Sequence, residues 1–153
     1  MSFFYTASQD AQAITTAVDL LHITVATDVP IRLWGFDIGN TTDLGDAAEE
    51  VLRIGIYRGV TGGAGGSALT EVAVHDRAPT ATAAVLGQAT ASTGGTLVKT
   101  IQWNVRQAGP AWIATLPDAT IRSSAANDPI AFRLLAAPAD SITLGYEVLW
   151  EEL

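Results

Sequence analysis

The sequence predicts an all-β protein: one antiparallel β-sandwich domain, jelly-roll-like, spanning residues 1–153. The clearest observation is the C-terminal segment 141–152. There Ile142, Leu144, Tyr146, Val148 and Trp150 fall on one side of an extended strand, and Ser141, Thr143, Gly145, Glu147 and Glu151 fall on the other. Side chains alternate faces along a strand, so this spacing buries one face and leaves the other in water. Other segments repeat the pattern, and no helical stripe competes with it.

Further strands are expected where short apolar runs lie between turn residues. In chain order these are residues 17–26, 31–38, 51–59, 81–92, 96–106, 111–116 and 130–137. Together with the terminal segments they give about eight or nine strands, which is typical of a sandwich or jelly roll. A parallel α/β fold would need crossover helices of about a dozen residues, which the pattern does not offer.

The segment 31–38 carries apolar residues on both faces of the expected strand. Strict alternation groups Arg32, Trp34, Phe36 and Ile38 on one face and Ile31, Leu33 and Asp37 on the other. This pattern predicts a central strand, or one that a partner covers.

Three aromatic residues, Phe3, Phe4 and Tyr5, lie together near the N-terminus. Chain ends fray unless they are tied down, so the aromatics predict that a short arm, about residues 1–8, docks on another surface. Two alternatives follow. The segment is the first strand of the chain's own sheet, or it contacts a partner.

Two loops stand out in composition. Residues 39–50 are polar and acidic, and a short helical turn is expected at 46–49. The glycine-rich run 62–67 opens a long excursion, about residues 60–80, that includes His75 and Arg77. Long loops in compact domains are usually functional or disordered, and this one could cover a face of the sandwich or reach a neighbouring subunit.

Composition limits the partners. Hydrophobic residues make up 48% of the chain and charged residues 16%, below the usual quarter or so, which favours a homo-oligomer that hides part of its surface. The formal net charge of −8 would repel phosphates, so we expect neither nucleic-acid nor membrane binding. Lys99 is the only lysine, and the arginines suit carboxylate contacts between subunits.

There is neither a signal-peptide pattern nor a cysteine, and synthesis in a cytoplasm is expected.

No set of residues predicts catalysis, a cofactor or a metal, so we expect a protein that is not an enzyme. His75 and Asp76 are sequence neighbours, which on a strand point to opposite faces, and no nucleophile elbow accompanies them. His22 is expected to be a satisfied, partly buried histidine. The acidic loop lacks the ligand spacing of an EF-hand, and a solvated loop is favoured over a calcium site. Core packing is favoured over sugar stacking for the tryptophans, Trp34, Trp103, Trp112 and Trp150.

The overall layout resembles the head decoration, or cement, proteins of tailed bacteriophages. The resemblance is carried by the N-terminal Phe-Phe-Tyr-Thr-Ala, the acidic Asp-Leu-Gly-Asp-Ala-Ala-Glu-Glu loop before residue 51, the glycine-rich excursion and the closing segment 137–152. It implies a homotrimer on the outside of the capsid that bridges major capsid proteins and needs no cofactor. It also implies that Phe3, Phe4 and Tyr5 contact the capsid. His75 and Arg77, in the long excursion, are further candidates for contact with a partner. The alternative is a carbohydrate- or receptor-binding module of a tail fibre.

Overall fold

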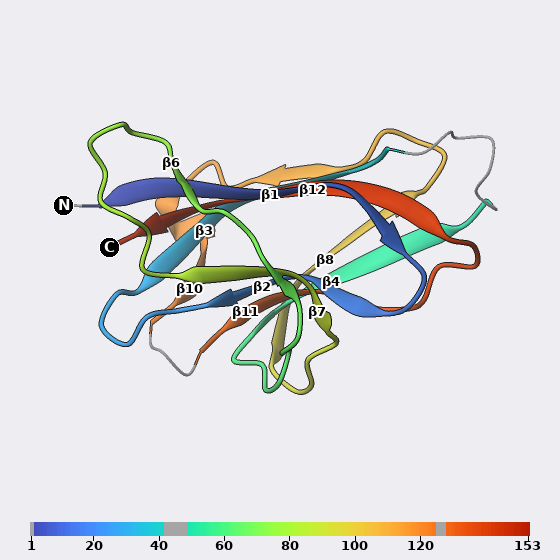
Figure 1. Ribbon diagram of the computed structural model, residues 1–153, viewed down its shortest axis with the longest axis horizontal. Helices are drawn as coiled ribbons and strands as arrows, with labels where there is room; N and C mark the ends of the chain where they lie inside the picture. The colour runs from blue at the N-terminus through green and yellow to red at the C-terminus, as the bar shows by residue number, and fades with distance from the viewer. Residues whose placement is uncertain (1, 42–48, 125–127) are drawn as a thin grey trace.

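Two antiparallel sheets make up the part of the chain that the computed structural model describes, residues 2–41, 49–124 and 128–153 (Figure 1). Sheet A has the order β10 (Ile121–Ser123), β3 (Ile31–Asn40), β12 (Ile142–Glu152), β1 (Phe3–Ile14) and β6 (Val72–Ala73), with β9 (Ala111–Ile113) also paired to β3. Sheet B has the order β5 (Ser67–Ala68), β7 (Ala84–Thr90), β2 (Val18–Thr24), β11 (Ile130–Leu134), β4 (Val51–Arg58) and β8 (Thr96–Asn104). The predicted antiparallel β-sandwich is confirmed.

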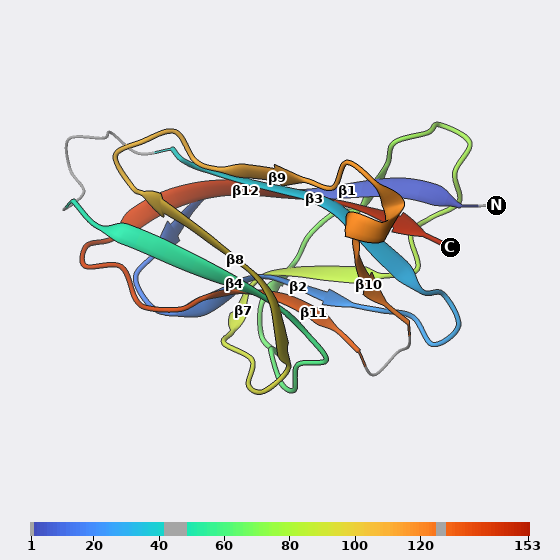
Figure 2. The ribbon, with the colours of Figure 1, turned by 180° about the vertical axis from the view of Figure 1, so that it is seen from behind.

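The sheets lie one above the other, with β1, β3 and β12 in one layer and β2, β4 and β11 in the other (Figures 1 and 2). A 3-10 helix, η1 (Pro117–Ala119), separates β9 from β10. Within the described ranges, no helix is both long enough and apolar enough to cross a membrane.

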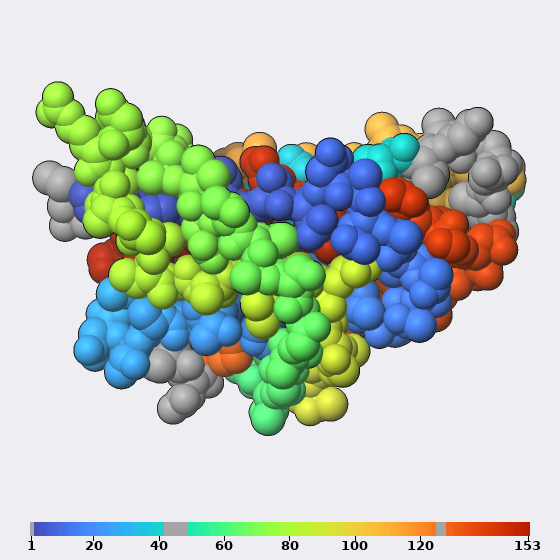
Figure 3. Space-filling view, in the orientation of Figure 1, coloured from blue at the N-terminus to red at the C-terminus, as the bar shows by residue number. Residues whose placement is uncertain are grey.

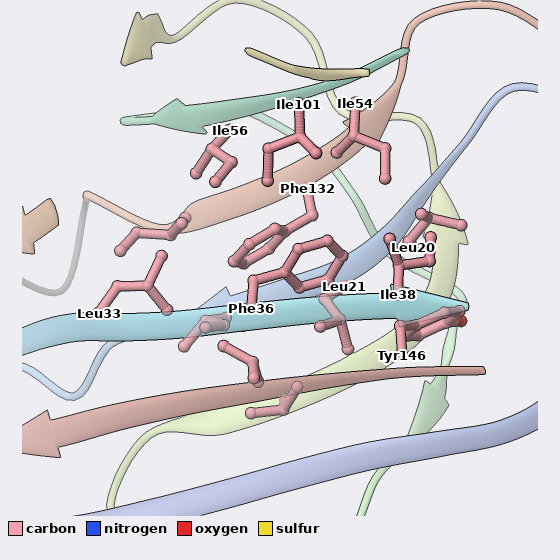
Figure 4. Close-up of a cluster of buried hydrophobic side chains, with 14 of the residues drawn as sticks. Leu20, Leu21, Leu33, Phe36, Ile38, Ile54, Ile56, Ile101, Phe132 and Tyr146 are labelled. Atoms are coloured by element: carbon pink, nitrogen blue, oxygen red, sulfur yellow. The ribbon is translucent and has the colours of Figure 1, made fainter. Parts of the chain in front are cut away.

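The core fills the space between the sheets (Figure 4). At its centre Phe36 of β3 and Phe132 of β11 stack with ring centroids 4.5 Å apart, which joins sheet A to sheet B. The alternation predicted for the C-terminal strand is confirmed on its apolar side, because Ile142, Leu144, Tyr146, Val148 and Trp150 are all at most 2% exposed. On its other side Glu147 is exposed, whereas Glu151 is buried.

A β-bulge in β3 overturns the face assignment made from strict alternation. Leu149 of β12 lies opposite Gly35, but the next residue, Trp150, lies opposite Leu33, so Trp34 is an extra residue in the ladder. A bulge of this kind shifts the alternation by one position. As a result the apolar residues on both sides of the bulge point into the core: Ile31, Leu33, Phe36 and Ile38. The prediction that Trp34 shares a face with Phe36 and Ile38 is wrong.

The N-terminal segment is the first strand of sheet A. β1 pairs with β12 along nearly its whole length, from Phe3 opposite Glu152 to Ile14 opposite Ile142. Residues 3–8, which were predicted to belong to a short arm, therefore lie in the sheet. Two alternatives were predicted for this segment, and in the structure it is the first strand of the chain's own sheet.

The excursion 60–80 crosses one side of the sandwich from sheet B to sheet A. Its first short strand, β5, pairs with β7, and its second, β6, pairs with β1. Leu69, between them, packs against the core. The excursion thus covers part of the sandwich, and residues 74–80 then form a loop that projects beyond β6 (Figures 1 and 3). Of the helical turn predicted at 46–49, residues 46–48 lie outside the described residues.

Candidate interaction surface

The outer face of sheet A carries an uncharged row of residues that crosses five strands. In register, Val72 of β6 lies beside Thr6 of β1, Thr6 beside Leu149 of β12, Leu149 beside Gly35 of β3, and Gly35 beside Ile113 of β9. We call these five residues the apolar row. Val72 is 55% exposed and Ile113 is 68% exposed, so both ends of the row lie in water. Between them Thr6 and Leu149 are half-buried and Gly35 is buried, so the exposed apolar area of the row lies at its two ends. Exposed apolar surface of this kind marks sites of interaction.

The apolar row faces outward because its strand neighbours face inward. Tyr5 and Ala7 flank Thr6, and Val148 and Trp150 flank Leu149, and all four flanking side chains are buried. Since side chains alternate along a strand, Thr6 and Leu149 point away from the core. Val74, two residues after Val72, is also 55% exposed and extends the apolar surface at the β6 edge.

Gly35 leaves a hollow in the row near its β9 end. A Cβ atom at position 35 would lie 3.3 Å from the Trp112 carbonyl oxygen, 3.7 Å from Ile113 Cγ1 and 3.8 Å from Leu149 Cβ. The hollow has a volume of about 110 Å³. Its lining residues are Gly35, Phe36, Asp37, Ala111, Ile113, Glu147 and Leu149. We call this feature the hollow.

Two carboxylates flank the hollow on one side. Glu147 of β12 lies directly opposite Asp37 of β3, and both side chains are exposed. Residues in this relation have Cβ atoms about 4.5–5.5 Å apart, and like charges so placed destabilise the pair. Neither carboxylate has a hydrogen-bond or ion-pair partner within the described residues. The hollow therefore suits a group with an apolar stem and a cationic head.

The three N-terminal aromatics occupy different environments. Tyr5 is 1% exposed, stacks on Trp150 with ring centroids 5.8 Å apart, and donates its hydroxyl to the Pro79 carbonyl at 3.0 Å. Phe3 packs against the core. Phe4 is partly exposed on the outer face of sheet A, where its ring lies 5.8 Å from that of Trp34. Of the three predicted contact residues, Tyr5 belongs to the core and Phe4 is the one on the outer face.

The other two predicted contact residues, His75 and Arg77, lie on the loop 74–80. Both are exposed. The Ala78 amide donates to the His75 carbonyl at 3.1 Å and closes a turn, which places Arg77 near the tip. The loop borders the N-terminal strand at both ends: the Val74 amide donates to the Phe4 carbonyl at 2.9 Å, and the Pro79 carbonyl accepts the Tyr5 hydroxyl. His75 has no carboxylate partner within the described residues.

The tryptophans lie in or against the packed layers. Trp103 and Trp150 are buried, as core packing predicts. Trp34 and Trp112 are half-buried, and each has a partner: the Trp34 indole donates to Glu151 Oε2 at 3.0 Å, and Lys99 Nζ lies 5.5 Å from the centre of the Trp112 ring.

A buried ionic network beneath the glycine-rich run was not visible in the sequence. Asp19, which is 0% exposed, is at its centre. Its Oδ2 atom lies 3.5 Å from His22 Nδ1 and accepts a hydrogen bond from the Ser92 amide at 3.1 Å. Its Oδ1 atom lies 3.6 Å from Arg133 Nε. Arg133 also donates to Ser92 Oγ at 2.8 Å. Gly63 lies over the imidazole at φ +83°, and any larger residue there would collide with His22.

Although this network contains a serine, a histidine and an aspartate, it is closed to substrates. Ser92 and His22 are each 4% exposed, and the serine hydroxyl accepts a hydrogen bond from Arg133. A buried charge needs a partner, and here the partners come from β2, β11 and the segment just after β7. The network joins these three segments of sheet B, and the glycine-rich run packs over it at Gly63. His22 is a satisfied histidine, as predicted, and it is fully rather than partly buried.

The last two residues of β12 are buried acids with structural contacts. Glu152 accepts from the Thr82 and Ala83 amides at 2.9 and 2.8 Å and so ties the segment before β7 to sheet A. Burial would raise the pKa of Glu151, but hydrogen bonds from Ser2 and Trp34 and the nearby Arg32 guanidinium outweigh it and hold that pKa below its usual value. Burial also raises the pKa of Tyr5, and the Glu152 carboxylate adds to this effect.

Within the described ranges, no three His, Asp or Glu side chains come close enough to hold a metal ion. The acidic loop that the calcium alternative concerned lies mostly outside those ranges, at residues 42–48.

Comparisons of the chain with protein-family models, with curated proteins and with solved structures give no match. The fold and the surface therefore define its class: an antiparallel β-sandwich with an exposed apolar row and a hollow on one sheet. The resemblance to decoration proteins stays a prediction.

Proposed function

We propose that the chain is a structural protein of a tailed-phage particle: a decoration protein that binds the outside of the head as a homotrimer and stabilises contacts between major capsid proteins. The observation that supports this proposal most is the apolar row on sheet A, which ends in the exposed Val72 and Ile113. A monomer in water gains nothing from such a surface, whereas an assembled protein gains its burial.

A decoration protein acts through linkage. Because it binds the assembled shell and not the separated subunits, it stabilises assembly by mass action. This role requires complementary surfaces and no reacting groups. The acidic chain, with a formal charge of −8, suits a surface that contacts protein rather than the packaged nucleic acid. The protein is made in the host cytoplasm and ends on the capsid exterior.

Among the predicted contact residues, the accessible ones are the natural candidates. Phe4 lies on the outer face of sheet A, and His75 and Arg77 lie on the projecting loop. Phe3 and Tyr5 support the same strand from its inner side. Contacts with other chains, whether the major capsid protein or the other copies in the trimer, would then use the outer face and the loop rather than a free N-terminal arm.

The experiment is a pair of measurements on the purified chain. Light scattering after size exclusion is expected to give three times the chain mass of 16.0 kDa. Labelled protein is expected to co-sediment to saturation with purified heads of the phage that encodes the chain, and to raise the temperature at which those heads open. A monomer that neither co-sediments nor stabilises heads would contradict the proposal. Binding on a glycan array without binding to heads would support the tail-fibre alternative instead.

A further inference from the structure

We propose that the hollow on sheet A receives Arg77 of a second copy of the chain, with its guanidinium between Asp37 and Glu147. The contact rests on the proposed function, since it joins subunits of the same trimer. It specifies which surfaces meet and which charges hold them together.

The hollow has a surface that matches the apolar stem of an arginine and another that matches its cationic head. Leu149 and Ile113 form an apolar wall, against which the methylene stem of an arginine can lie. Asp37 and Glu147 stand side by side at the rim, and their mutual repulsion is relieved when a cation binds between them. A planar guanidinium presents several donors at once and can bond both carboxylates, which a lysine ammonium does less well.

Arg77 is suited to supply that cation. It is exposed, it lies near the tip of the turn 75–78, and it has no ion pair within the described residues. Arg32, Arg58 and Arg133 are paired within their own chain, to Glu151, Asp128 and Asp19, whereas the exposed Arg53 and Arg122 lie on strands β4 and β10 rather than on a projecting loop. Arg77 is thus a cationic side chain on a projecting loop that nothing within the described part of its own chain neutralises.

The positions of the two surfaces suggest how subunits are arranged. The loop follows β6, at one edge of sheet A, and the hollow lies on β3, β12 and β9, toward the opposite edge. One chain can therefore offer its loop to a neighbour while its own hollow receives another loop. Such a heterologous contact generates a closed ring when the rotation between subunits closes, as it does in a trimer.

The test is a charge exchange measured by sedimentation equilibrium. Arg77→Glu is expected to raise the dissociation constant of self-association at least about tenfold, because it replaces an attraction with a repulsion. The receiving side is changed in the variant D37R/E147R, with the same expected loss. The triple variant R77E/D37R/E147R restores the attraction with its sign reversed and is expected to recover most of the association. Arg53→Glu, an equal charge change on the exposed side of β4, is the matched control.

The changed side chains are all exposed, so each variant is expected to unfold at the temperature of the wild type at a concentration where both are monomeric, and this is checked first. Loss in R77E and in D37R/E147R, recovery in the triple variant and no loss in R53E would support the contact. A wild-type trimer that R77E weakens no more than R53E does would overturn the contact and leave the proposed function standing. A wild type that stays monomeric throughout would overturn the trimer and the contact together.

Discussion

Replacing Phe132 with alanine tests how the two sheets are held together. The ring is 0% exposed and stacks on Phe36 of the other sheet with centroids 4.5 Å apart. Phenylalanine-to-alanine changes in packed cores cost about 3–5 kcal/mol. The loss of the aromatic pair accounts for about 0.5–1.5 kcal/mol of that figure. A domain of this size has roughly 5–15 kcal/mol of stability in total, so Phe132→Ala is expected to remove a large fraction of it.

The assay is equilibrium unfolding in urea followed by tryptophan fluorescence. With a slope of about 2 kcal/mol per molar urea, a loss of about 4 kcal/mol lowers the midpoint by roughly 2 M. Leu97→Ala is the control, because Leu97 is 48% exposed and its truncation is expected to cost no more than about 0.5 kcal/mol. A midpoint for Phe132→Ala that matches the control would refute the packing described here.

Three further predictions concern the ionic network, the C-terminal acid and the apolar row. Asp19→Ala is expected to lower the free energy of unfolding in urea by about 3–5 kcal/mol, because it leaves the Arg133 charge without its buried partner. Asp118→Ala, at an exposed position, is the control, and equal stability of the two variants would contradict a stabilising role of the network. Because the folded pKa of Glu151 is lowered, its ionised form adds stability above the unfolded value near 4.5, and this stability is lost as pH falls through the lower folded pKa. The stability gap between wild type and Glu151→Gln is therefore expected to shrink below pH 4.5 in a series of urea titrations, and a gap independent of pH would count against it. Ile113→Glu is expected to leave the free energy of unfolding of the monomer within about 0.5 kcal/mol of wild type while it weakens self-association in sedimentation, and unchanged association would argue against the row.

The regular strands could be predicted because their sequence pattern reports burial directly. The apolar residues of β12 alternate without interruption, and each of them is buried. The segments that became β4, β7, β8 and β11 were located in the same way, to within a few residues at each end.

Strict alternation failed where the ladder slips. Trp34 is an extra residue opposite the Leu149–Trp150 step of β12, so the face of every residue beyond it is reversed. Nothing in residues 31–38 alone distinguishes a bulged strand from a straight one, because the bulge is fixed by pairing with a strand about a hundred residues away. The two-residue strands β5 and β6 could not be predicted from the sequence for a similar reason, since they form by pairing with β7 and β1 rather than because of their own composition.

The candidate surface was only partly foreseeable. The low charge content predicted that some apolar surface would be shared with other subunits, and the loop with His75 and Arg77 was recognised as a contact candidate. The apolar row and the hollow were not, because their residues come from five strands spread along the chain and meet only through sheet registration. The network around Asp19 was hidden in the same way, since Ser92 and Arg133 are distant in sequence.

Hydrogen exchange of the backbone amides, measured over a range of protein concentrations that spans the proposed self-association, tests most directly whether the outer face of sheet A is the surface that other molecules cover. Exchange is expected to slow on association in β6, in β9 and in the loop 74–80, and to stay unchanged in β2 and β4 of the opposite sheet. Slowing confined to the free edge of β8, with none in β6 or β9, would contradict this account.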